Sequence, residues 1–317
     1  MSYIPIKPNK KGFTELMDID LRNIVPFINR KFFFRAWRLG GNYPGIASVC
    51  DCGSCKTSWL MTFDKAERDK AEEALMLYRD AQAELRTFLN EHCITVNAVL
   101  AIYDARSEND DIIIDTGERV VTIPTLRQQT PSLDGYCYAL SDFLSPTNDY
   151  IGIFATTVHG AEKLAEIYES EGNTYRAILA KTLADRLAEA SAEYLHYQVR
   201  TKYWGYVPDE APDVSRILKA RYQGIRPAVG YPSLPDQSVI FDLDAVVDFR
   251  KIGIRLTENG AMYPNASVCG LYFAHPASKY FMVGKIDDEQ LNNYALRRHR
   301  TAEEMRKWLV GNIKSDF

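Results

Sequence analysis

The sequence predicts an α+β fold whose strands pair antiparallel. Apolar strand patterns and long helical patterns occur in separate blocks along the chain, whereas a parallel α/β sheet needs strands and helices in alternation. Neither G-x-G-x-x-G nor G-x-x-x-x-G-K-S/T occurs, which argues against a Rossmann or P-loop nucleotide site. With 317 residues, the chain is long enough to bury a large core.

The first third of the chain is expected to be mostly helical. Residues 20–46 are dense in aromatic side chains and predict a helix or buried segment that stops at Gly40 and Gly41. Residues 64–91 show the clearest helical pattern, with Asp64 as a candidate cap and Glu67 three residues later. The apolar stripe of this helix consists of Ala71, Ala74, Leu75, Tyr78, Ala81, Leu85, Phe88 and Leu89.

A block of strands follows, and then a block of helices. The expected strands are rich in β-branched and aromatic residues and cover 98–105, 112–114, 120–126 and 150–158. A polar turn near Asn109 and Asp110 predicts that the first two form a hairpin. The expected helices cover 161–169, ending near Gly172, and 174 to about 200.

The last part of the chain again places strands before helices. The expected strands cover 252–256, 266–274 and 280–286, with a turn at 258–260 between the first two. Two short helices close the chain. Thr301 and Glu304 form a capping box for the last helix, and Gly311 is its expected stop.

Composition excludes several classes of protein. The net charge of −4 gives no electrostatic footprint for nucleic acid, so no nucleic-acid partner is expected. No run of about 18 apolar residues is present, so no membrane span is expected. The first residues, MSYIPIKPNKKGF, lack the apolar region of a signal peptide. We therefore expect a cytoplasmic protein.

Three of the six cysteines, Cys50, Cys52 and Cys55, form the sequence Cys-Asp-Cys-Gly-Ser-Cys. In a cytosolic protein, such clustering indicates metal or redox chemistry more readily than a disulfide framework. A tetrahedral zinc site needs a fourth ligand, which Cys93 or a histidine could supply only through the fold. The cluster is therefore either a metal or redox site or a loop of reduced thiols.

Residues 224–235 place one arginine, Arg226, in a stiff segment that contains three prolines and two glycines. The prolines fix φ, and the glycines let the backbone approach another group closely. Arginine is the side chain best suited to hold a carboxylate or phosphate in a bidentate fork. The segment is therefore either an anion-binding site or a rigid surface turn with an ordinary salt bridge.

The long helix that starts at residue 174 has an apolar side and a more polar side. The apolar side carries Leu179, Leu183, Leu187, Ala190 and Tyr194 at helical spacing. The opposite side carries Asp185, Glu189, Ala192 and His196. This polar side is either a solvated face or an acidic strip that meets a cationic ligand or a partner protein.

Several motifs follow one another in a fixed order from residue 183 onward. They are Leu183-Ala-Asp-Arg-Leu-Ala-Glu189, Tyr194-Leu-His196, Tyr203-Trp-Gly-Tyr206, Tyr222-Gln-Gly-Ile-Arg-Pro-Ala-Val-Gly-Tyr-Pro232, Leu256-Thr-Glu-Asn-Gly-Ala-Met262, Ala266-Ser-Val-Cys-Gly-Leu-Tyr-Phe273, His275-Pro276 and Ser278-Lys-Tyr-Phe281. Together they resemble the activation (reactivation) domain at the C-terminus of cobalamin-dependent methionine synthase. The resemblance covers residues 33 to 308 and is weakest over 45–125.

The resemblance implies a C-shaped single domain, residues 1–317, around a twisted antiparallel sheet with long flanking helices. Its residues 1–95 form a more divergent, mostly helical part. The resemblance also implies binding of S-adenosylmethionine and rescue of cobalamin that has been oxidised to the inactive Co(II) form. In this family an electron arrives, usually from flavodoxin, and the methyl group of S-adenosylmethionine is transferred to cobalt.

The resemblance assigns ligand contacts residue by residue. Arg226 matches the arginine that holds the ligand carboxylate, and the backbone around Ala228 matches positions that contact the ligand. Tyr231 matches a tyrosine of the same motif. Tyr280 and Phe281 match a Tyr-Tyr pair at the site, so the second phenol is lost in this sequence.

The sequence also departs from the family pattern near the expected site. Glu189 matches a glutamate near the ligand, but Asn29 stands where the family has an aspartate that contacts the ligand amino group. Asparagine can accept the same hydrogen bond but lacks the charge attraction to an ammonium group. Ala220 replaces a glutamate, Gln237 replaces a histidine, and the cysteine cluster is not part of the pattern. These changes affect the expected affinity more than the class of ligand.

The resemblance implies action in trans, because the chain has no Asp-x-His-x-x-Gly cobalamin motif. Cobalamin is expected on a separate methionine synthase module, with a flavodoxin-like electron donor. Asp185 matches an aspartate that meets the cobalamin-binding module, and Glu189 and His196 are further candidates for this contact. No catalytic acid or base is expected, because methyl transfer needs mainly positioning. Two alternatives are a non-catalytic S-adenosylmethionine-binding protein and a reactivator of another corrinoid protein.

Overall fold

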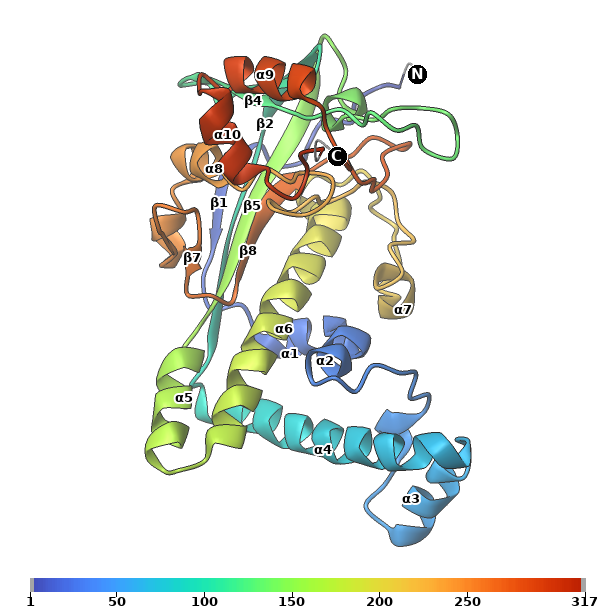
Figure 1. Ribbon diagram of the computed structural model, residues 1–317. Helices are drawn as coiled ribbons and strands as arrows, with labels where there is room; N and C mark the ends of the chain where they lie inside the picture. Colours follow the sequence, from blue (N-terminus) through green and yellow to red (C-terminus); the bar gives the residue numbers. More distant parts are fainter. Residues whose placement is uncertain (1–2, 315–317) are drawn as a thin grey trace.

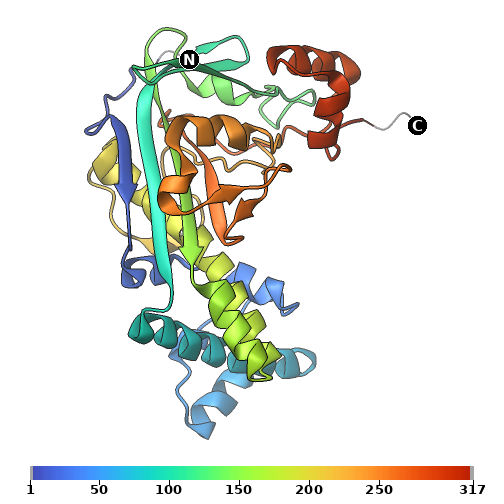
Figure 2. The same ribbon diagram turned by 90° about the vertical axis from the view of Figure 1, so that its left-hand side faces the viewer.

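The structure, a computed structural model, describes residues 3–314 and is built around a six-stranded sheet (Figures 1 and 2). The strands of this sheet are β1 (Gly12–Leu16), β2 (Thr95–Glu108), β3 (Asp111–Asp115), β4 (Val120–Pro124), β5 (Asp149–His159) and β8 (Ser267–Tyr272). Two further short strands, β6 (Arg255–Leu256) and β7 (Met262–Tyr263), pair with each other. All pairs are antiparallel, which confirms the predicted fold class.

Strand β2 is the centre of the sheet because both of its edges are paired. One edge pairs with β5 over residues 95–105. The other edge is shared, since β1 pairs with residues 98–102 and β3 pairs with residues 104–108. The remaining strands complete the order β4-β3-β2-β5-β8, which leaves one edge of β8 free of other named strands.

The helices vary widely in length, and two of them are much longer than the rest. They are α1 (Leu21–Ile24), α2 (Arg30–Ala36), α3 (Gly53–Leu60), α4 (Arg68–Glu91), α5 (Ala161–Ser170), α6 (Thr174–Gln198), α7 (Val214–Ile217), α8 (Val239–Val247), α9 (Asp288–Arg297) and α10 (Ala302–Trp308). The predicted capping box of Thr301 and Glu304 starts α10. No helix among residues 3–314 has the length and apolarity needed to cross a bilayer.

The two faces of the sheet support two separate cores, because successive side chains of a strand point in opposite directions. Leu100 and Ile102 of β2 pack with α4, α5 and α6 in one core. Val99 and Ala101 pack with α8, α9 and α10 in the other. Since both faces are covered, residues 96–102 are all buried, which explains the continuous apolar run at 98–102.

The arrangement of the long elements gives the molecule its outline. In Figure 1, α4 projects sideways from the lower end of the sheet, and the loop between β4 and β5 projects to the same side from the upper end. The result is the C-shaped outline that the resemblance implies. Helix α6 runs along the sheet inside this outline, and it packs against β5 and β8 as well as α1, α2 and α4.

Several expected elements differ in the structure. Residues 280–286 were expected to be a strand, but Gly284 has a φ of 74°, outside the extended region, and Ile286 forms only an isolated bridge with Ile313. Residues 249–252 form a 3₁₀ turn that ends at Gly253, so only 255–256 remain extended there. Strand β1 was not anticipated.

One helix start and two helix ends also differ from the predicted positions. A 3₁₀ turn at 65–67 precedes α4, and in the described part of the chain the side chain of Asp64 makes no capping hydrogen bond. Helix α6 ends at Gln198 and continues as a π-helical turn over Val199–Tyr203. Helix α10 ends at Trp308, before the expected stop at Gly311.

Candidate functional site

A cavity of about 240 Å³ lies between α6, the start of α2 and the proline-rich segment 224–235. Four of the predicted ligand residues line it together, although they come from distant parts of the chain. They are Asn29 at the start of α2, Glu189 on α6, and Arg226 and Tyr231 in the proline-rich segment. The fold therefore brings the central part of the predicted site to one place.

The proline-rich segment is held in place by the free edge of β8. The N–H of Leu271 donates to the Pro227 carbonyl at 3.0 Å, and the N–H of Val229 donates to the Cys269 carbonyl at 3.0 Å. The position of Pro227 at an edge explains why the missing N–H of a proline is tolerated there. The segment therefore extends the sheet by one irregular strand and presents Arg226 to α6.

Arg226 is held by two carboxylates of α6. Its Nη2 atom lies 2.6 Å from Oε1 of Glu193 and 3.8 Å from Oε2 of Glu189. Its backbone N–H donates to the hydroxyl of Tyr280 at 3.0 Å. Glu193 was not among the predicted residues, although its place one helical turn after Glu189 puts it on the same face of α6.

The guanidinium of Arg226 keeps unused donor capacity. Its side chain is 11% exposed, and no hydrogen-bond partner for its buried Nε atom exists within residues 3–314. Burial lowers the pKa of Arg226, but Glu193, Tyr280 and Glu189 raise it more, so the net pKa lies above its ordinary value. A permanently charged donor that lacks a partner favours binding of an anion.

Tyr231 closes one side of the cavity. Its hydroxyl donates to Oε1 of Glu189 at 2.6 Å, and the residue is 51% exposed. Burial and then the charge of Glu189 raise the pKa of Tyr231 to about 12, so its phenol stays protonated near neutral pH. The cavity therefore combines two arginines, Arg186 and Arg226, with two carboxylates and an aromatic wall, which suits a ligand that carries charges of both signs.

Comparison with known proteins decides the family. A family model described as vitamin B12 dependent methionine synthase, activation domain, matches residues 20–299. The chain belongs to this family. A solved structure described as the crystal structure of the MetH reactivation domain bound to AdoHcy has the same fold, with a TM-score of 0.87 and 35% sequence identity. The match covers 99% of this chain and 94% of that chain, so this activation domain is matched over nearly its whole length.

Two other predicted ligand residues of this activation domain lie behind the cavity wall. Ala228 is 5% exposed and forms an isolated bridge with Gly270 of β8. Phe281 is 9% exposed and belongs to the core on the other face of the sheet, where its ring packs against Tyr138 and Phe143. In this structure the two side chains therefore support the segment and do not line the cavity.

The three positions that depart from the family pattern have local structural roles. Asn29 caps α2 by accepting the N–H of Lys31 at 3.1 Å, and it still lines the cavity. Gln237 donates to the carbonyl of Gly260 at 2.9 Å. Ala220 is exposed and has a φ of 51°. Only Asn29 of these three lines the cavity in the described structure.

The expectation that His196 contacts a partner is wrong for this structure. His196 has no exposed surface, because its ring is packed among Tyr272 of β8 and Tyr206 and Tyr222 of the segment that follows α6. Its ring stacks on Tyr272 with centroids 5.1 Å apart, and its Nε2 lies 3.3 Å from the hydroxyl of Tyr206. Ala192 is buried as well, so the polar side of α6 ends near Glu193.

Burial of His196 has a consequence for stability at acid pH. Burial and then the charges of Arg200 and Arg226 hold the pKa of His196 well below its ordinary value. The unfolded chain therefore takes up a proton first, and the free energy of unfolding falls as the pH drops below about 6.5, by up to about 1.4 kcal/mol per pH unit.

The variant His196→Gln is expected to remove this part of the pH dependence. Urea unfolding between pH 7.5 and 5 should show that the stability difference between wild type and variant shrinks as the pH falls. Parallel pH profiles for the two proteins would contradict the assignment of this dependence to His196.

Asp185 and the cysteine cluster lie outside the cavity. Asp185 is exposed on α6, one turn before Glu189, where a partner protein can reach it. Cys50, Cys52 and Cys55 come together at the start of α3, beyond the first turn of α4. The structure therefore shows that the cavity, Asp185 and the cysteine cluster are three separate places, which the sequence did not reveal.

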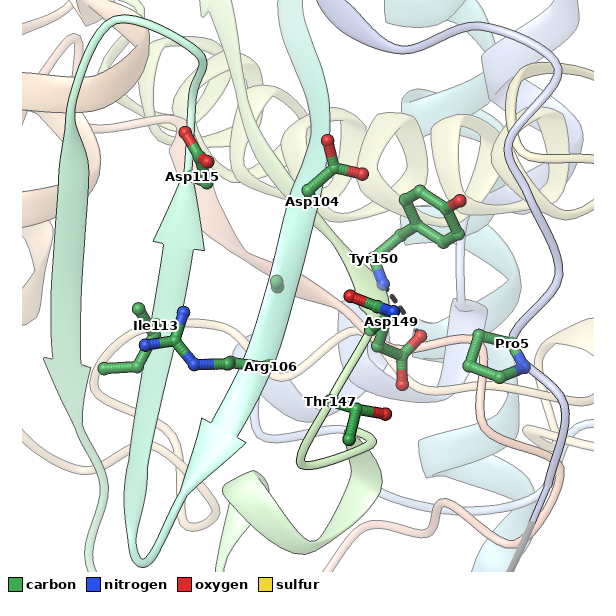
Figure 3. Close-up of a pocket in the computed structure, with 10 residues that line it drawn as sticks. Pro5, Asp104, Arg106, Ile113, Asp115, Thr147, Asp149 and Tyr150 are labelled. Carbon is green, nitrogen blue, oxygen red and sulfur yellow. Dashed lines mark hydrogen bonds between the residues drawn. The ribbon is translucent and has the colours of Figure 1, made fainter.

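A second hollow, of about 500 Å³, lies at one end of the sheet (Figure 3). Asp104 and Arg106 of β2, Asp115 of β3 and Asp149 of β5 line it. At the wall of the hollow, the N–H of Tyr150 donates to the Asp149 carboxylate at 2.7 Å. None of the predicted ligand residues is among the described residues that line this hollow, and its excess of carboxylates is unsuited to an anionic group.

Proposed function

We propose that this chain binds S-adenosylmethionine in the cavity at Arg226 and supports reductive remethylation of cobalamin carried by a separate methionine synthase module. The observation that carries the proposal is the buried guanidinium of Arg226, which has an unused donor at the wall of a cavity. The solved structure with the same fold holds AdoHcy, which is S-adenosylmethionine without the transferable methyl group.

The charges of the cavity match those of the amino-acid end of this ligand. The ligand carboxylate accepts hydrogen bonds from Arg226 and replaces the 3.8 Å contact that Arg226 makes with Glu189. The ligand ammonium and sulfonium groups lie toward Glu189 and Asn29, with the ring of Tyr231 as a further attraction for positive charge. Pockets for drug-sized ligands usually enclose about 300–1,000 Å³, so the cavity of about 240 Å³ holds this end and leaves the nucleoside nearer the surface.

The contribution of the protein to methyl transfer is positioning. The residues of this chain would hold the donor so that its methyl carbon faces outward. Cobalamin on the partner, once reduced by the electron donor, would supply the nucleophile that takes the methyl group from sulfur and leaves AdoHcy. Correct orientation of two reactants can supply roughly 7–11 kcal/mol of the barrier. None of the described residues that line the cavity needs to act as an acid or a base in such a transfer.

The test uses an assay in trans with a methionine synthase that lacks its own activation domain. Wild-type protein is expected to bind S-adenosylmethionine in calorimetry and to restore activity to the inactivated enzyme when an electron donor is present. The variant Asp185→Ala is expected to bind the ligand normally but to lower the reactivation rate at least tenfold, or about 1.4 kcal/mol. Asp209→Ala, which removes another exposed carboxylate, serves as the matched control.

The possible outcomes separate the competing functions. Absence of binding at millimolar S-adenosylmethionine would overturn the proposal. Binding without reactivation of any corrinoid protein would favour a non-catalytic binding protein, and reactivation of a corrinoid protein other than methionine synthase would favour the other alternative. Normal reactivation by Asp185→Ala would show that the partner docks elsewhere.

A further inference from the structure

Three thiol groups converge at the start of α3, far from the cavity at Arg226. The Sγ atoms of Cys50, Cys52 and Cys55 all lie within 4.8 Å of one another, and those of Cys50 and Cys52 are 3.1 Å apart. All three residues are exposed and none forms a disulfide. In Figure 1, α3 lies below the start of α4, at the end of the helical arm that projects from the sheet.

Local structure explains why the three sulfurs meet. Cys52 is the N-cap of α3, and its Sγ accepts the N–H of Cys55 at 3.3 Å. Cys55 lies in the first turn of α3, and its side chain points back toward the N-terminus of the helix, where Cys52 is. Cys50 precedes the cap by two residues and approaches from the other side. The spacing Cys-x-Cys-x-x-Cys therefore brings the three sulfur atoms together at the start of α3.

The loop is attached to α4 by positively charged side chains. The Nη2 atom of Arg79 donates to the carbonyl of Cys50 at 2.8 Å and lies 3.3 Å from the Asp51 carboxylate. Lys56 forms an ion pair with Glu72 of α4. These contacts hold the three sulfurs in a fixed place and put positive charge beside them.

We propose that Cys50, Cys52 and Cys55 bind one Zn²⁺ ion through three thiolates, with solvent in the fourth position. A Zn–S bond is about 2.3 Å long, so sulfurs at three corners of a tetrahedron lie about 3.8 Å apart. The Cys50–Cys52 pair at 3.1 Å and the upper limit of 4.8 Å for all three sulfurs are close to this spacing, and because the side chains are exposed, small rotations bring them to it. Thiolates are soft ligands that select zinc over magnesium or calcium.

The charge balance supports the same assignment. Binding replaces three S–H protons with three S–Zn bonds, so up to three protons leave and the site carries one net negative charge. Arg79 of α4, which donates to the Cys50 carbonyl, places a guanidinium beside that charge. Among the described residues no fourth cysteine, histidine or carboxylate joins the cluster, so water is the fourth ligand.

The ion would close the loop before α3 onto the first turn of that helix. Because this loop lies on the helical arm, the zinc site is independent of the cavity at Arg226 and of the proposed function. Its loss is expected to change the local stability of α3 but not the affinity for S-adenosylmethionine.

The test titrates fully reduced protein with Zn²⁺ against a chromophoric chelator, and with Cd²⁺ to follow thiolate-to-metal absorption in the ultraviolet. Wild type is expected to bind one ion per chain. Cys52→Ser is expected to weaken zinc binding at least about 100-fold, more than removal of an outer-shell partner usually does. The matched control Cys137→Ser, at a cysteine outside the cluster, is expected to bind as wild type does.

Two results would overturn the proposal. The first is equal zinc binding by wild type and Cys52→Ser. The second is failure of the reduced wild type to bind zinc, with mass spectrometry of the isolated protein showing a disulfide or only free thiols in the cluster. The three side chains are exposed, so their substitution is not expected to unfold the protein. Circular dichroism checks this, and it distinguishes loss of the ion from loss of the fold.

Discussion

The variant Arg226→Gln is expected to raise the dissociation constant for S-adenosylmethionine at least about 100-fold, or about 2.7 kcal/mol. Arg186 and Arg226 both line this cavity with an unused Nε donor, but Arg226 is the one held in place by Glu193 and by the segment bonded to β8. Glutamine retains some hydrogen-bonding capacity but neither the charge nor the planar fork. Calorimetry with S-adenosylmethionine measures the effect.

The same substitution also affects stability, and a second variant separates the two effects. Glu193 is 17% exposed and loses its ion-pair partner in Arg226→Gln, and breaking a buried pair costs about 3–5 kcal/mol. The double variant Arg226→Gln/Glu193→Gln removes both charges and is expected to recover much of the stability without recovering binding. Arg250→Gln, at an exposed arginine, is the matched control.

Recovery of ligand binding in the double variant would contradict the role of Arg226. It would show that the single substitution had acted through the fold alone. Unchanged binding in the single variant would contradict the proposed site directly, whatever happens to stability.

The variant Gly270→Ala is expected to lower the free energy of unfolding by about 2–4 kcal/mol and to weaken ligand binding at least about tenfold. A Cβ atom at position 270 would lie 2.2 Å from the Pro227 carbonyl oxygen and 2.8 Å from the Cα atom of Ala228. Both neighbours are backbone atoms, so the segment must move away from β8. That movement breaks the hydrogen bonds at Pro227 and Val229 and displaces Arg226.

Urea unfolding and calorimetry measure the two effects of Gly270→Ala. Gly40→Ala is the matched control, because a Cβ atom at position 40 meets no atom within 4 Å and the φ angle there suits an alanine. Wild-type stability in Gly270→Ala would show that the proline-rich segment does not depend on close contact with β8. Lower stability with unchanged ligand affinity would show that the position of this segment does not set the site.

Local patterns in the sequence predicted most of the regular elements. The apolar stripe of 64–91 and the capping box at Thr301 depend on residues within a few positions of one another, and both appear in the structure. The strand at 280–286 failed because its β-branched and aromatic content did not reveal that Gly284 takes a positive φ. Strand β1 was missed because five residues carry too little periodicity to stand out.

The candidate site was predicted only in part, because a local pattern reveals a residue with unusual neighbours but not its partners from distant segments. Arg226 stood out because its proline-rich surroundings are unusual within a dozen residues. Glu193, its nearest partner, is one of many glutamates on a helix, and only the approach of segment 224–235 to α6 distinguishes it.

By itself, the sequence determined the fold class and the family and singled out Arg226 as a candidate anion-binding residue, because periodicity, capping and ordered motifs are properties of neighbouring residues. Only the tertiary structure decided which side chains share the cavity and which are hidden. His196 lies on the polar side of α6 by spacing, yet it is fully buried because Tyr272 of β8 and two tyrosines from the segment after α6 pack around its ring. Burial is the sum of contacts from distant segments, so no local pattern could predict it.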